Sequence, residues 1–446
     1  MARREKTNYL IIGNSAGGIG AAEAIREADK AGAITMISDE PYPAYSRPLI
    51  SEYLVNRRPL EMMLFRPPDF YEKSNIRSLF GEKVARVDFN EQSAKLESGR
   101  TLAWQKLLLA TGGLPIVPQI EGIGSKGVFT FTRLDDARAI DRFLNQYGRG
   151  VRAVVIGGGL IGVSVTEALV KRGVEVTIVE IKERILNTIL DEQASALEEK
   201  ALMQAGVEII TGHTVGRIGS RGKAVSVTLD DSRSIPGEMV IIAIGVQPRT
   251  ELVAGAGIKT NRGIVVDRHM ATSRPDVYAC GDVAEAYDFV YGENRLTPIW
   301  PNAYVGGRTA GSNMAGAAAE YQGGTAMNSL KYFGVNIVSA GMVTPPDDGY
   351  ETVSEKHGDI YRKVVLKDRR IAGMVFAGDI EKSGIIYNLM KDRVDVDRFK
   401  EVLVADDFGL ASLPEEIWRA RLAIPPSVLT SSPSSVEQPA EVFAGE

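Results

Sequence analysis

The chain has 446 residues, of which 44% are hydrophobic and 24% charged, and its formal net charge at neutral pH is -5. This length exceeds one ordinary hydrophobic core and predicts two or three domains. The acidic balance gives no electrostatic reason to expect nucleic acid or an anionic membrane as a partner. A single cysteine excludes an internal disulfide and every C-x-x-C motif, and three widely spaced histidines predict no metal site.

The N-terminus shows no targeting signal. The first residues, MARREKTNYLIIG, run directly into a strand-and-glycine pattern without the apolar segment and cleavage site of a signal peptide. The longest uncharged stretches, such as 332–346, are too short to span a bilayer and are interrupted by glycine and proline. We therefore expect a soluble, cytoplasmic protein.

A first nucleotide-binding unit is predicted near the N-terminus. Residues 8–13 form a short apolar run typical of a buried strand, GNSAGG at 13–18 opens an alanine-rich helix, and a second strand at 33–38 ends at an acidic pair. This is the order of the dinucleotide-binding motif. Backbone N–H groups at the helix start would hold a pyrophosphate, and the acid would accept from ribose hydroxyls. The expected contacts are Gly13, Ser15, which replaces the usual second glycine, Ala16, Gly18, Asp39 and Glu40.

A second copy of this motif, at 152–180, has the full glycine spacing. Gly157, Gly159 and Gly162 form the turn, and Glu180 closes the next strand. A carboxylate there accepts from a ribose 2′-hydroxyl and repels a 2′-phosphate, which favours NADH over NADPH. The two units together predict two bound nucleotides, one per unit.

Three further segments carry a family resemblance. LLLATGG at 107–113, VIIAIGVQPRTEL at 240–252 and DVYACGDVAE at 276–285 stand, with the two glycine turns, in the order and spacing of the FAD-dependent pyridine nucleotide-disulfide oxidoreductases. More narrowly, residues 7 to 415 resemble the branch of rubredoxin and ferredoxin reductases, NADH oxidases and the flavin portion of NADH-dependent nitrite reductases. The resemblance implies an α/β fold with two nested Rossmann-like dinucleotide-binding domains and a smaller α+β C-terminal domain.

The resemblance also implies domain boundaries, cofactors and further contacts. An FAD-binding domain (1–118 and 249–325) is split by an NAD-binding domain (119–248), and a C-terminal interface domain (326–421) precedes a disordered tail (422–446). FAD and NADH are the expected cofactors, so the first glycine turn belongs to the FAD site. A helix starting near Asn302 is expected to point its N-terminus at the flavin. The matching motifs give as further FAD contacts Arg47, Val84, Ala110, Thr111, Gly112, Arg133, Gly281 and Asp282, and as a further NAD contact Gly245.

The segment PYPAYSRPLISEYL at 41–54 determines which chemistry the flavin meets. Cysteine-bearing relatives place a reactive thiol in this region. Ferredoxin reductases have a lysine at the position of Glu52, paired with a glutamate at the position of Ser164. This chain has neither the thiol nor the ion pair, so disulfide or peroxide reduction through a protein thiol is rejected. Arg47 is expected to contact flavin or phosphate, and Glu52 is the candidate catalytic residue, as a group that tunes the flavin.

The C-terminal third alternates short apolar strands with turns. KVVLKDRRIAGMVF at 363–376 predicts a hairpin, and a helix is expected from about Lys382. The resemblance implies that this domain contacts partner chains, and a homodimer is one expectation. The residues after Arg421 are rich in proline and serine and predict disorder.

Three functions agree with these features. The first is an NADH:acceptor oxidoreductase that passes electrons through FAD to a protein carrier, because the chain has no cysteine set for a cluster of its own. Rubredoxin, ferredoxin or an iron–sulfur partner subunit would serve. The second is an NADH oxidase or small-molecule reductase that reacts directly at the flavin. The third is an NADH-responsive redox binding protein resembling apoptosis-inducing factor, which the acidic charge and the plain N-terminus disfavour. The direction of electron flow is left open.

Overall fold

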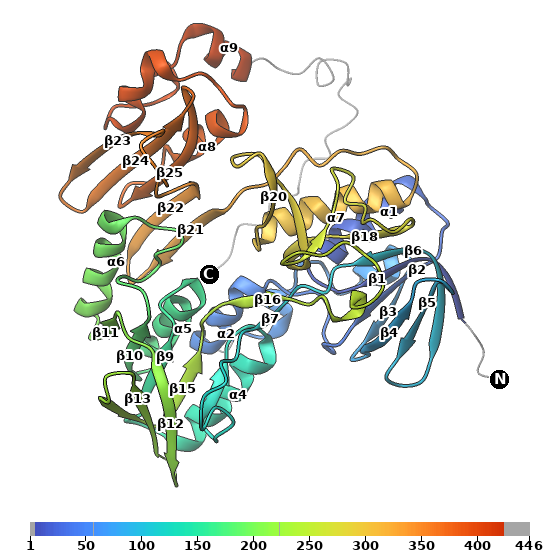
Figure 1. The fold of residues 1–446 in the computed structure, drawn as a ribbon, viewed down its shortest axis with the longest axis horizontal. Coiled ribbons are helices and arrows are strands. Elements are labelled where there is room, and N and C mark those ends of the chain that lie inside the picture. The colour runs from blue at the N-terminus through green and yellow to red at the C-terminus, as the bar shows by residue number, and fades with distance from the viewer. Residues whose placement is uncertain (1–4, 57, 223, 423–446) are drawn as a thin grey trace, which may run out of the picture.

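The computed structural model describes residues 5–56, 58–222 and 224–422. Its main β-sheets lie in three regions of the molecule, one drawn mostly in blue and yellow, one in green, and one in orange and red (Figure 1). The predicted disordered tail lies outside the described residues, apart from Leu422 at the end of α9 (Glu415–Leu422).

The first sheet is built around the N-terminal strand. Its order is β3-β2-β1-β6-β5-β4, and β18 pairs in parallel with the end of β6. The chain therefore leaves this sheet after β6 and returns to it much later with β18. The strands are β1 (Glu5–Ile12), β2 (Ile34–Ser38), β3 (Ile76–Phe80), β4 (Val84–Asp88), β5 (Ser93–Leu96), β6 (Thr101–Leu109) and β18 (Val277–Ala279).

Two glycine-containing helices, α1 (Ala16–Ala28) and α7 (Trp300–Met314), pack against each other beside this sheet (Figure 1). A Cβ atom on Gly307 would lie 2.0 Å from the carbonyl oxygen of Gly17. Glycine at such a crossing lets two backbones approach without a side chain between them. Helix α7 begins slightly before the expected start at Asn302, because Pro301 is well suited to a first helical turn.

The second sheet is wholly parallel, with the order β11-β10-β9-β15-β8, and all of its strands lie in the sequence between β6 and β18. The second unit is thus inserted into the first, which confirms the nested fold class. An antiparallel sheet, β12-β13-β14, lies next to it. The strands are β8 (Val128–Thr130), β9 (Arg152–Ile156), β10 (Glu175–Glu180), β11 (Glu208–Thr211), β12 (Val215–Arg221), β13 (Ala224–Leu229), β14 (Ser234–Gly237) and β15 (Met239–Ile242).

Short strands and helices complete these two units. The chain passes from the first unit to the second through β7 and back through β16, and these two short strands pair with each other. Strands β17, β19 and β20 form a separate small sheet. These strands are β7 (Gly113–Pro115), β16 (Val246–Pro248), β17 (Ile264–Val265), β19 (Ala284–Asp288) and β20 (Glu293–Leu296). The remaining helices are α2 (Ile50–Asn56), α3 (Phe70–Lys73), α4 (Leu134–Tyr147), α5 (Leu160–Lys171) and α6 (Glu192–Gln204).

The third sheet is antiparallel, with the order β21-β22-β25-β24-β23. The hairpin expected at 363–376 is confirmed as β24 and β25, with Asp368 and Arg369 at positive φ in its turn. Helix α8 begins at Ser383, next to the expected start. The elements are β21 (Met327–Tyr332), β22 (Val335–Gly341), β23 (Glu351–His357), β24 (Ile360–Lys367), β25 (Arg370–Ala377) and α8 (Ser383–Lys391).

A buried polar contact fixes the third sheet to the second unit. Asp191, which caps α6, accepts hydrogen bonds from the Tyr361 hydroxyl at 2.7 Å and from Lys363 Nζ at 2.9 Å. All three residues are buried, and Lys363 Nζ also donates to the carbonyl oxygen of Val343 at 2.9 Å, so these buried polar groups find their partners within the protein. The order of the three regions agrees with the predicted domain organisation, whose residue boundaries stay predictions.

Among the helices of the described ranges, none has the combination of length and apolar character that is needed to cross a lipid bilayer.

Candidate cofactor site

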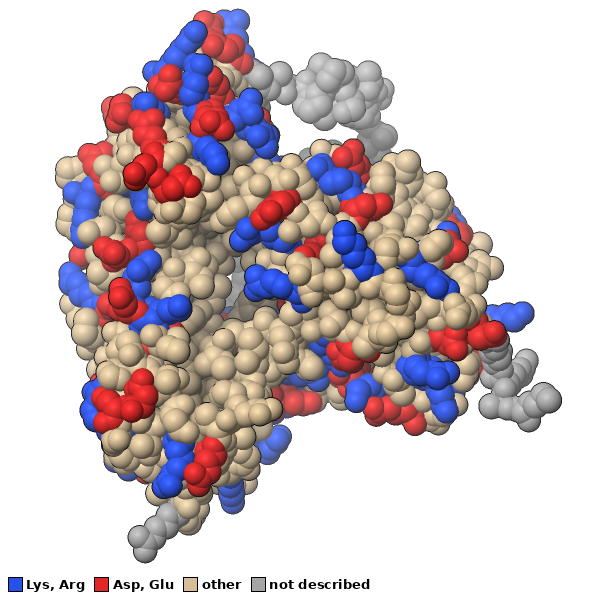
Figure 2. Space-filling view, viewed as in Figure 1, with Lys and Arg blue, Asp and Glu red and all other residues tan. Residues whose placement is uncertain are grey.

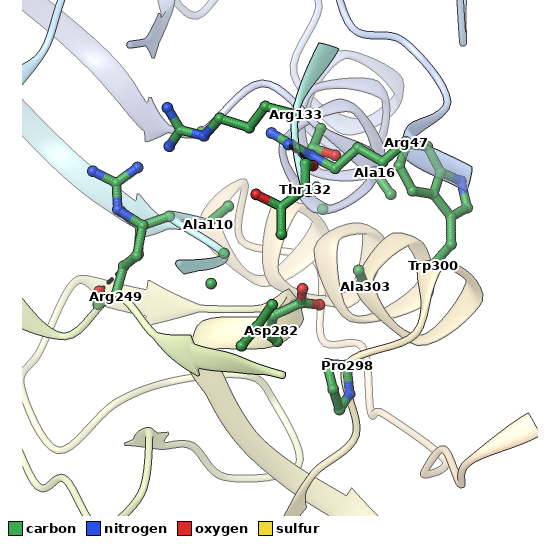
Figure 3. A pocket seen from close by; sticks show the side chains of 18 of the residues that line it. Ala16, Arg47, Ala110, Thr132, Arg133, Arg249, Asp282, Pro298, Trp300 and Ala303 are labelled. Atoms are coloured by element: carbon green, nitrogen blue, oxygen red, sulfur yellow. Dashed lines mark hydrogen bonds between the residues drawn. The ribbon is translucent and has the colours of Figure 1, made fainter. Parts of the chain in front are cut away.

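A cavity of about 870 Å³ lies where the three regions meet. That volume is within the range of roughly 300–1,000 Å³ typical of ligand sites. Side chains enter it from opposite walls, with Asp282 facing Thr132 and with Arg249 and Trp300 on different sides (Figure 3). Most of the predicted FAD contacts line it: Gly13, Ser15, Ala16, Asp39, Glu40, Arg47, Val84, Ala110, Thr111, Gly112, Arg133, Gly281 and Asp282.

The first glycine turn forms one wall. Gly13 has φ +124°, and a Cβ atom there would lie 2.0 Å from the carbonyl oxygen of Ala110. Gly18 does not line the cavity; a Cβ on it would lie 2.0 Å from the carbonyl oxygen of Gly13, so its role is close packing of helix on strand. Ser15 occupies the N-cap position of α1 without a capping hydrogen bond from its side chain, and the N-terminus of α1 opens into the cavity, where it offers backbone N–H groups and a partial positive charge to an anion.

Two arginines converge on Asp39 at the end of β2. Arg249 Nη1 and Arg133 Nη2 lie 3.0 and 3.2 Å from the same carboxylate oxygen. Burial tends to raise the pKa of Asp39, but the two guanidinium groups hold it below its usual value. Arg249 is also paired with Glu251 at 3.1 Å, and the N–H groups that these contacts leave over on the two guanidinium groups suit phosphate. Sequence reasoning missed Arg249, although it lies inside the quoted motif at 240–252.

A second charged cluster lies on the segment 41–54. Glu40 is buried, accepts a hydrogen bond from the Tyr45 hydroxyl at 2.6 Å, and forms an ion pair with Arg47. Arg47 also donates to the carbonyl oxygen of Thr132 at 3.1 Å, and 37% of its side chain stays accessible in the cavity wall. Glu40 therefore orients Arg47, whose remaining N–H groups are free to serve a ligand.

Asp282 and the start of α7 form the opposite wall. Burial raises the pKa of Asp282, although the Arg47 charge counteracts this. Trp300, Pro301 and Ala303 from the first turns of α7 line the same region, as the sequence predicts for this helix N-terminus. Cys280 is fully buried, and burial raises the pKa of its thiol to about 12, so it stays un-ionised at neutral pH.

These residues fit FAD. A helix N-terminus and the guanidinium groups of Arg133 and Arg249 suit the pyrophosphate, and a buried carboxylate suits acceptance from the hydroxyls of the ribityl chain. The glycines of the turn leave no Cβ where the backbone must come close to a ligand or to a neighbouring strand. Val84, the predicted contact whose place is on β4, also lines this cavity.

The second glycine turn lies outside this cavity. A Cβ on Gly162 would lie 1.9 Å from the carbonyl oxygen of Gly157, whereas a Cβ on Gly159 would meet no neighbouring group within 4 Å, so the space beside Gly159 is open to a ligand. A Cβ on Gly245, which has φ +116°, would lie 3.7 Å from its nearest neighbour, the Cδ1 atom of Ile116. Glu180 is buried, and its two oxygens accept from the backbone N–H groups of Gly158 and Lys182 at 2.6 and 2.8 Å. The spare lone pairs of that carboxylate can accept ribose hydroxyls.

The two nucleotide sites meet at α5. Its N-terminal turn carries the second glycine motif, and Leu160, Ile161 and Ser164 on the same helix line the FAD cavity. Tyr332 reaches this place from β21 of the third sheet and lines the same cavity as Ser164. No local pattern in the sequence marked Tyr332, because it is distant from every glycine motif.

Glu52 does not line the cavity. It lies on α2, where Arg47, Pro48 and Ile50 of the same segment provide the lining instead. The proposed tuning of a flavin by Glu52 therefore finds no support in the cavity geometry and stays a prediction.

One cluster elsewhere combines potential metal ligands. His213, Asp230 and Asp231 bring their ligand atoms within 4.8 Å of one another on the surface. His213 Nδ1 lies 2.9 Å from Asp230, and Arg233 pairs with Asp231 at 2.5 Å, so each of these groups already has a partner within the protein. On the face shown in Figure 2, positive and negative side chains are interspersed.

The chain matches two family models. The pyridine nucleotide-disulphide oxidoreductase model matches residues 7–310, and the rubredoxin NAD+ reductase C-terminal domain model matches residues 327–394. The epsilon subunit of the NADH-dependent phenylglyoxylate dehydrogenase of Aromatoleum evansii is 30% identical, over 93% of this chain and 99% of that protein. The NADH-rubredoxin oxidoreductase of Clostridium acetobutylicum is 31% identical, over 84% of this chain and 92% of its own length. Among solved structures, the covalent complex of putidaredoxin reductase with putidaredoxin aligns with a TM-score of 0.81 at 25% identity, over 93% of this chain and 98% of that one.

Proposed function

Because the chain belongs to the pyridine nucleotide-disulphide oxidoreductase family and is an FAD- and NADH-dependent oxidoreductase, we propose that it exchanges electrons between NADH and an iron–sulfur protein partner. Bound FAD accepts two electrons as a hydride and can give them up one at a time. The residues of this chain bind and orient the two nucleotides, with the N-terminus of α1, Arg133 and Arg249 directed at phosphate and Asp282 at hydroxyl groups.

The observation that carries the proposal is the absence of a redox-active thiol. The chain has one cysteine, and Cys280 is buried with a thiol pKa of about 12. A disulfide-forming or peroxide-reducing enzyme needs an ionised, accessible thiol. Electrons that enter the cavity must therefore leave from the flavin itself, and the chain has no cysteine set to hold a cluster of its own.

The functions for which the relatives are named agree with a protein acceptor. The Aromatoleum protein, which matches this chain over almost its full length, is one subunit of a larger NADH-dependent enzyme, and the Clostridium protein is named for rubredoxin. We infer that the partner of this chain is an iron–sulfur subunit or a small carrier of the rubredoxin or ferredoxin type. A homodimer and a cytoplasmic location stay predictions.

Direct reaction at the flavin is the second candidate. Pro298 both lines the cavity and is exposed to solvent. The cavity is therefore open to solvent beside Pro298, where a small molecule could reach its interior. The third alternative, a redox-responsive binding protein, is favoured by neither the site geometry nor the interspersed charges of Figure 2.

The test compares acceptors after anaerobic reduction of the FAD-loaded protein with one equivalent of NADH. Flavin absorbance is followed by stopped flow after mixing with oxidised rubredoxin, oxidised ferredoxin or aerated buffer. Reoxidation by one of the carriers well ahead of oxygen is the expected result. Reoxidation by oxygen within seconds, with no faster carrier, would refute the proposal in favour of the oxidase. A flavin that NADH does not reduce would contradict the whole assignment.

A further inference from the structure

Glu167 is a carboxylate on α5 that the site described above does not use. Only 15% of its side chain is exposed. Its Oε1 atom accepts a hydrogen bond from the backbone N–H of Phe333 at 2.9 Å, and its Oε2 atom pairs with Lys171 Nζ at 3.1 Å. A mostly buried charge is costly unless it has partners, so these contacts fix the side chain in place. The first of them joins the second unit to the third sheet, because Phe333 directly follows β21.

Glu167 continues the side of α5 that forms part of the cofactor cavity. Leu160 and Ser164 of this helix line the cavity, and Glu167 lies about one helical turn beyond Ser164 on the same side. Helix α5 and strand β21 contact each other where the green and orange regions of the molecule meet (Figure 1). One side of α5 therefore contributes first to the cavity wall and then to the contact with the third sheet.

The turn that Glu167 contacts has an unfavourable residue in it. Phe333 and Gly334 connect β21 to β22, and Tyr332 pairs with Val335 across the turn. Phe333 has φ +48° and Gly334 has φ +88°, whereas turns of this kind favour Asn-Gly. A bulky residue is strained in this conformation and keeps it only where the surroundings impose it. The hydrogen bond from the Phe333 N–H to Glu167 and the packing of Phe333 against the core of the second unit supply that constraint.

Tyr332, the residue before this turn, lines the cofactor cavity. Tyr332 is half-buried, whereas Lys331 and Gly334 on either side of it and of the turn are exposed, so this turn separates the cavity from solvent. The charged parts of the cavity suit the phosphate and ribityl groups of FAD. The lining near Tyr332 is largely apolar and suits the flavin ring, with contributions from Ile50, Leu160, Ile161, Met327 and Leu330.

We propose that Glu167 is a positioning residue, which holds the turn at Phe333 so that Tyr332 stays in the cavity wall and shields the flavin from dissolved oxygen. Glu167 does not line the cavity, so it acts through Phe333 and Tyr332. The inference rests on the proposed function, in which electrons leave the flavin for a protein carrier. Without the shield, oxygen accepts both electrons from the reduced flavin, takes up two protons from the flavin and solvent, and leaves as hydrogen peroxide.

The first measurement is hydrogen exchange of the segment around Phe333, followed by mass spectrometry in the FAD-loaded protein. Glu167→Ala removes the acceptor of the Phe333 N–H, and loss of a hydrogen bond to a charged group should speed exchange there by about tenfold to a hundredfold. Glu167→Gln keeps an acceptor oxygen and should restore most of the protection. Lys171→Gln is the matched control, because it removes the other partner of Glu167 and should exchange like the wild type. Equal exchange in Glu167→Ala and the wild type would overturn the proposal.

The second measurement is the reaction of the reduced flavin with oxygen. The FAD-loaded protein is reduced anaerobically with one equivalent of dithionite, without NADH or a carrier, and mixed with aerated buffer in a stopped-flow instrument. Flavin reoxidation should be faster in Glu167→Ala than in the wild type, with Glu167→Gln and Lys171→Gln close to the wild type. Faster hydrogen exchange in Glu167→Ala without faster reoxidation would show a purely structural role for Glu167 and overturn the proposal.

Tyr332→Ala keeps the inference testable if Glu167→Ala fails to fold or loses FAD. This variant removes the ring from the cavity wall, so reoxidation by oxygen should be faster while the Phe333 N–H stays protected. Reoxidation of Tyr332→Ala at the wild-type rate would overturn the proposal. Failure of NADH to reduce the flavin, or of a carrier to reoxidise it, would contradict the proposed function alone, because these measurements use neither.

Discussion

Glu180 offers a quantitative test of the second nucleotide site. Its carboxylate accepts from the N–H groups of Gly158 and Lys182 at 2.6 and 2.8 Å, and it stands at the end of β10 beside the glycine turn. Glu180→Gln keeps the size of the side chain but leaves one acceptor oxygen, and the new NH2 group faces a backbone donor. The variant also loses the charge that would hold the adenosine ribose of NADH.

The size of the effect follows from the hydrogen bonds that are lost. A hydrogen bond to a charged group contributes about 1.5–3 kcal/mol, and each 1.4 kcal/mol is a factor of about ten in affinity. We therefore expect the Kd of NADH to rise between about tenfold and a hundredfold. NADPH no longer meets a negative charge, so its Kd should rise less or fall, and the preference for NADH should drop at least about tenfold.

The assay is anaerobic stopped-flow reduction of the bound FAD over a range of NADH and NADPH concentrations, which gives a Kd for each. Glu183→Gln is the matched control, because Glu183 is an exposed carboxylate three residues further along the chain. The ratio of the two Kd values separates ribose recognition from damage to the loop, since damage would weaken both nucleotides equally. An unchanged ratio in Glu180→Gln would refute the assignment of Glu180 to the ribose.

Three further predictions concern packing and protonation. Gly307→Ala should lower the free energy of unfolding by about 1–3 kcal/mol in urea denaturation, because its methyl group would lie 2.0 Å from the carbonyl oxygen of Gly17. Gly384→Ala, whose methyl meets no atom within 4 Å, is its control, and equal stability of the two variants would contradict the close helix contact. Cys280 should resist iodoacetamide in the native protein and react after unfolding, since burial raises its pKa to about 12; rapid labelling of the native protein would contradict this. Glu198 lies on α6 with 1% of its surface exposed, and Glu198→Gln should raise Tm more at about pH 8 than at about pH 5. The folded-state pKa of Glu198, about 8, lies above its ordinary 4.5, so protonated Glu198 favours the fold at low pH and this advantage falls by about 1.4 kcal/mol per pH unit up to the folded pKa. A difference in Tm that does not change with pH would show that Glu198 is not buried as described.

The sequence by itself determined the short motifs whose residues are close together in the chain. Both glycine turns, the acids that end β2 and β10, and the hairpin of β24 and β25 were predicted and are present. Each depends on residues close together in the chain, where the spacing of apolar residues and the need for glycine are direct consequences of backbone geometry. Most of the expected FAD contacts line one cavity because they belong to these short motifs.

Only the tertiary structure decided which distant side chains meet. Arg249 joins Arg133 at Asp39, and Tyr332 from the third sheet lines the same cavity as Ser164. The position of Glu52 in a motif suggested a role at the flavin, but Glu52 is not among the residues that line the cavity. Whether a carboxyl group such as that of Glu198 is solvated or buried depends on which helices and strands pack around it. This packing depends on the sum of many weak contacts between segments far apart in the chain, so no short sequence pattern predicts it.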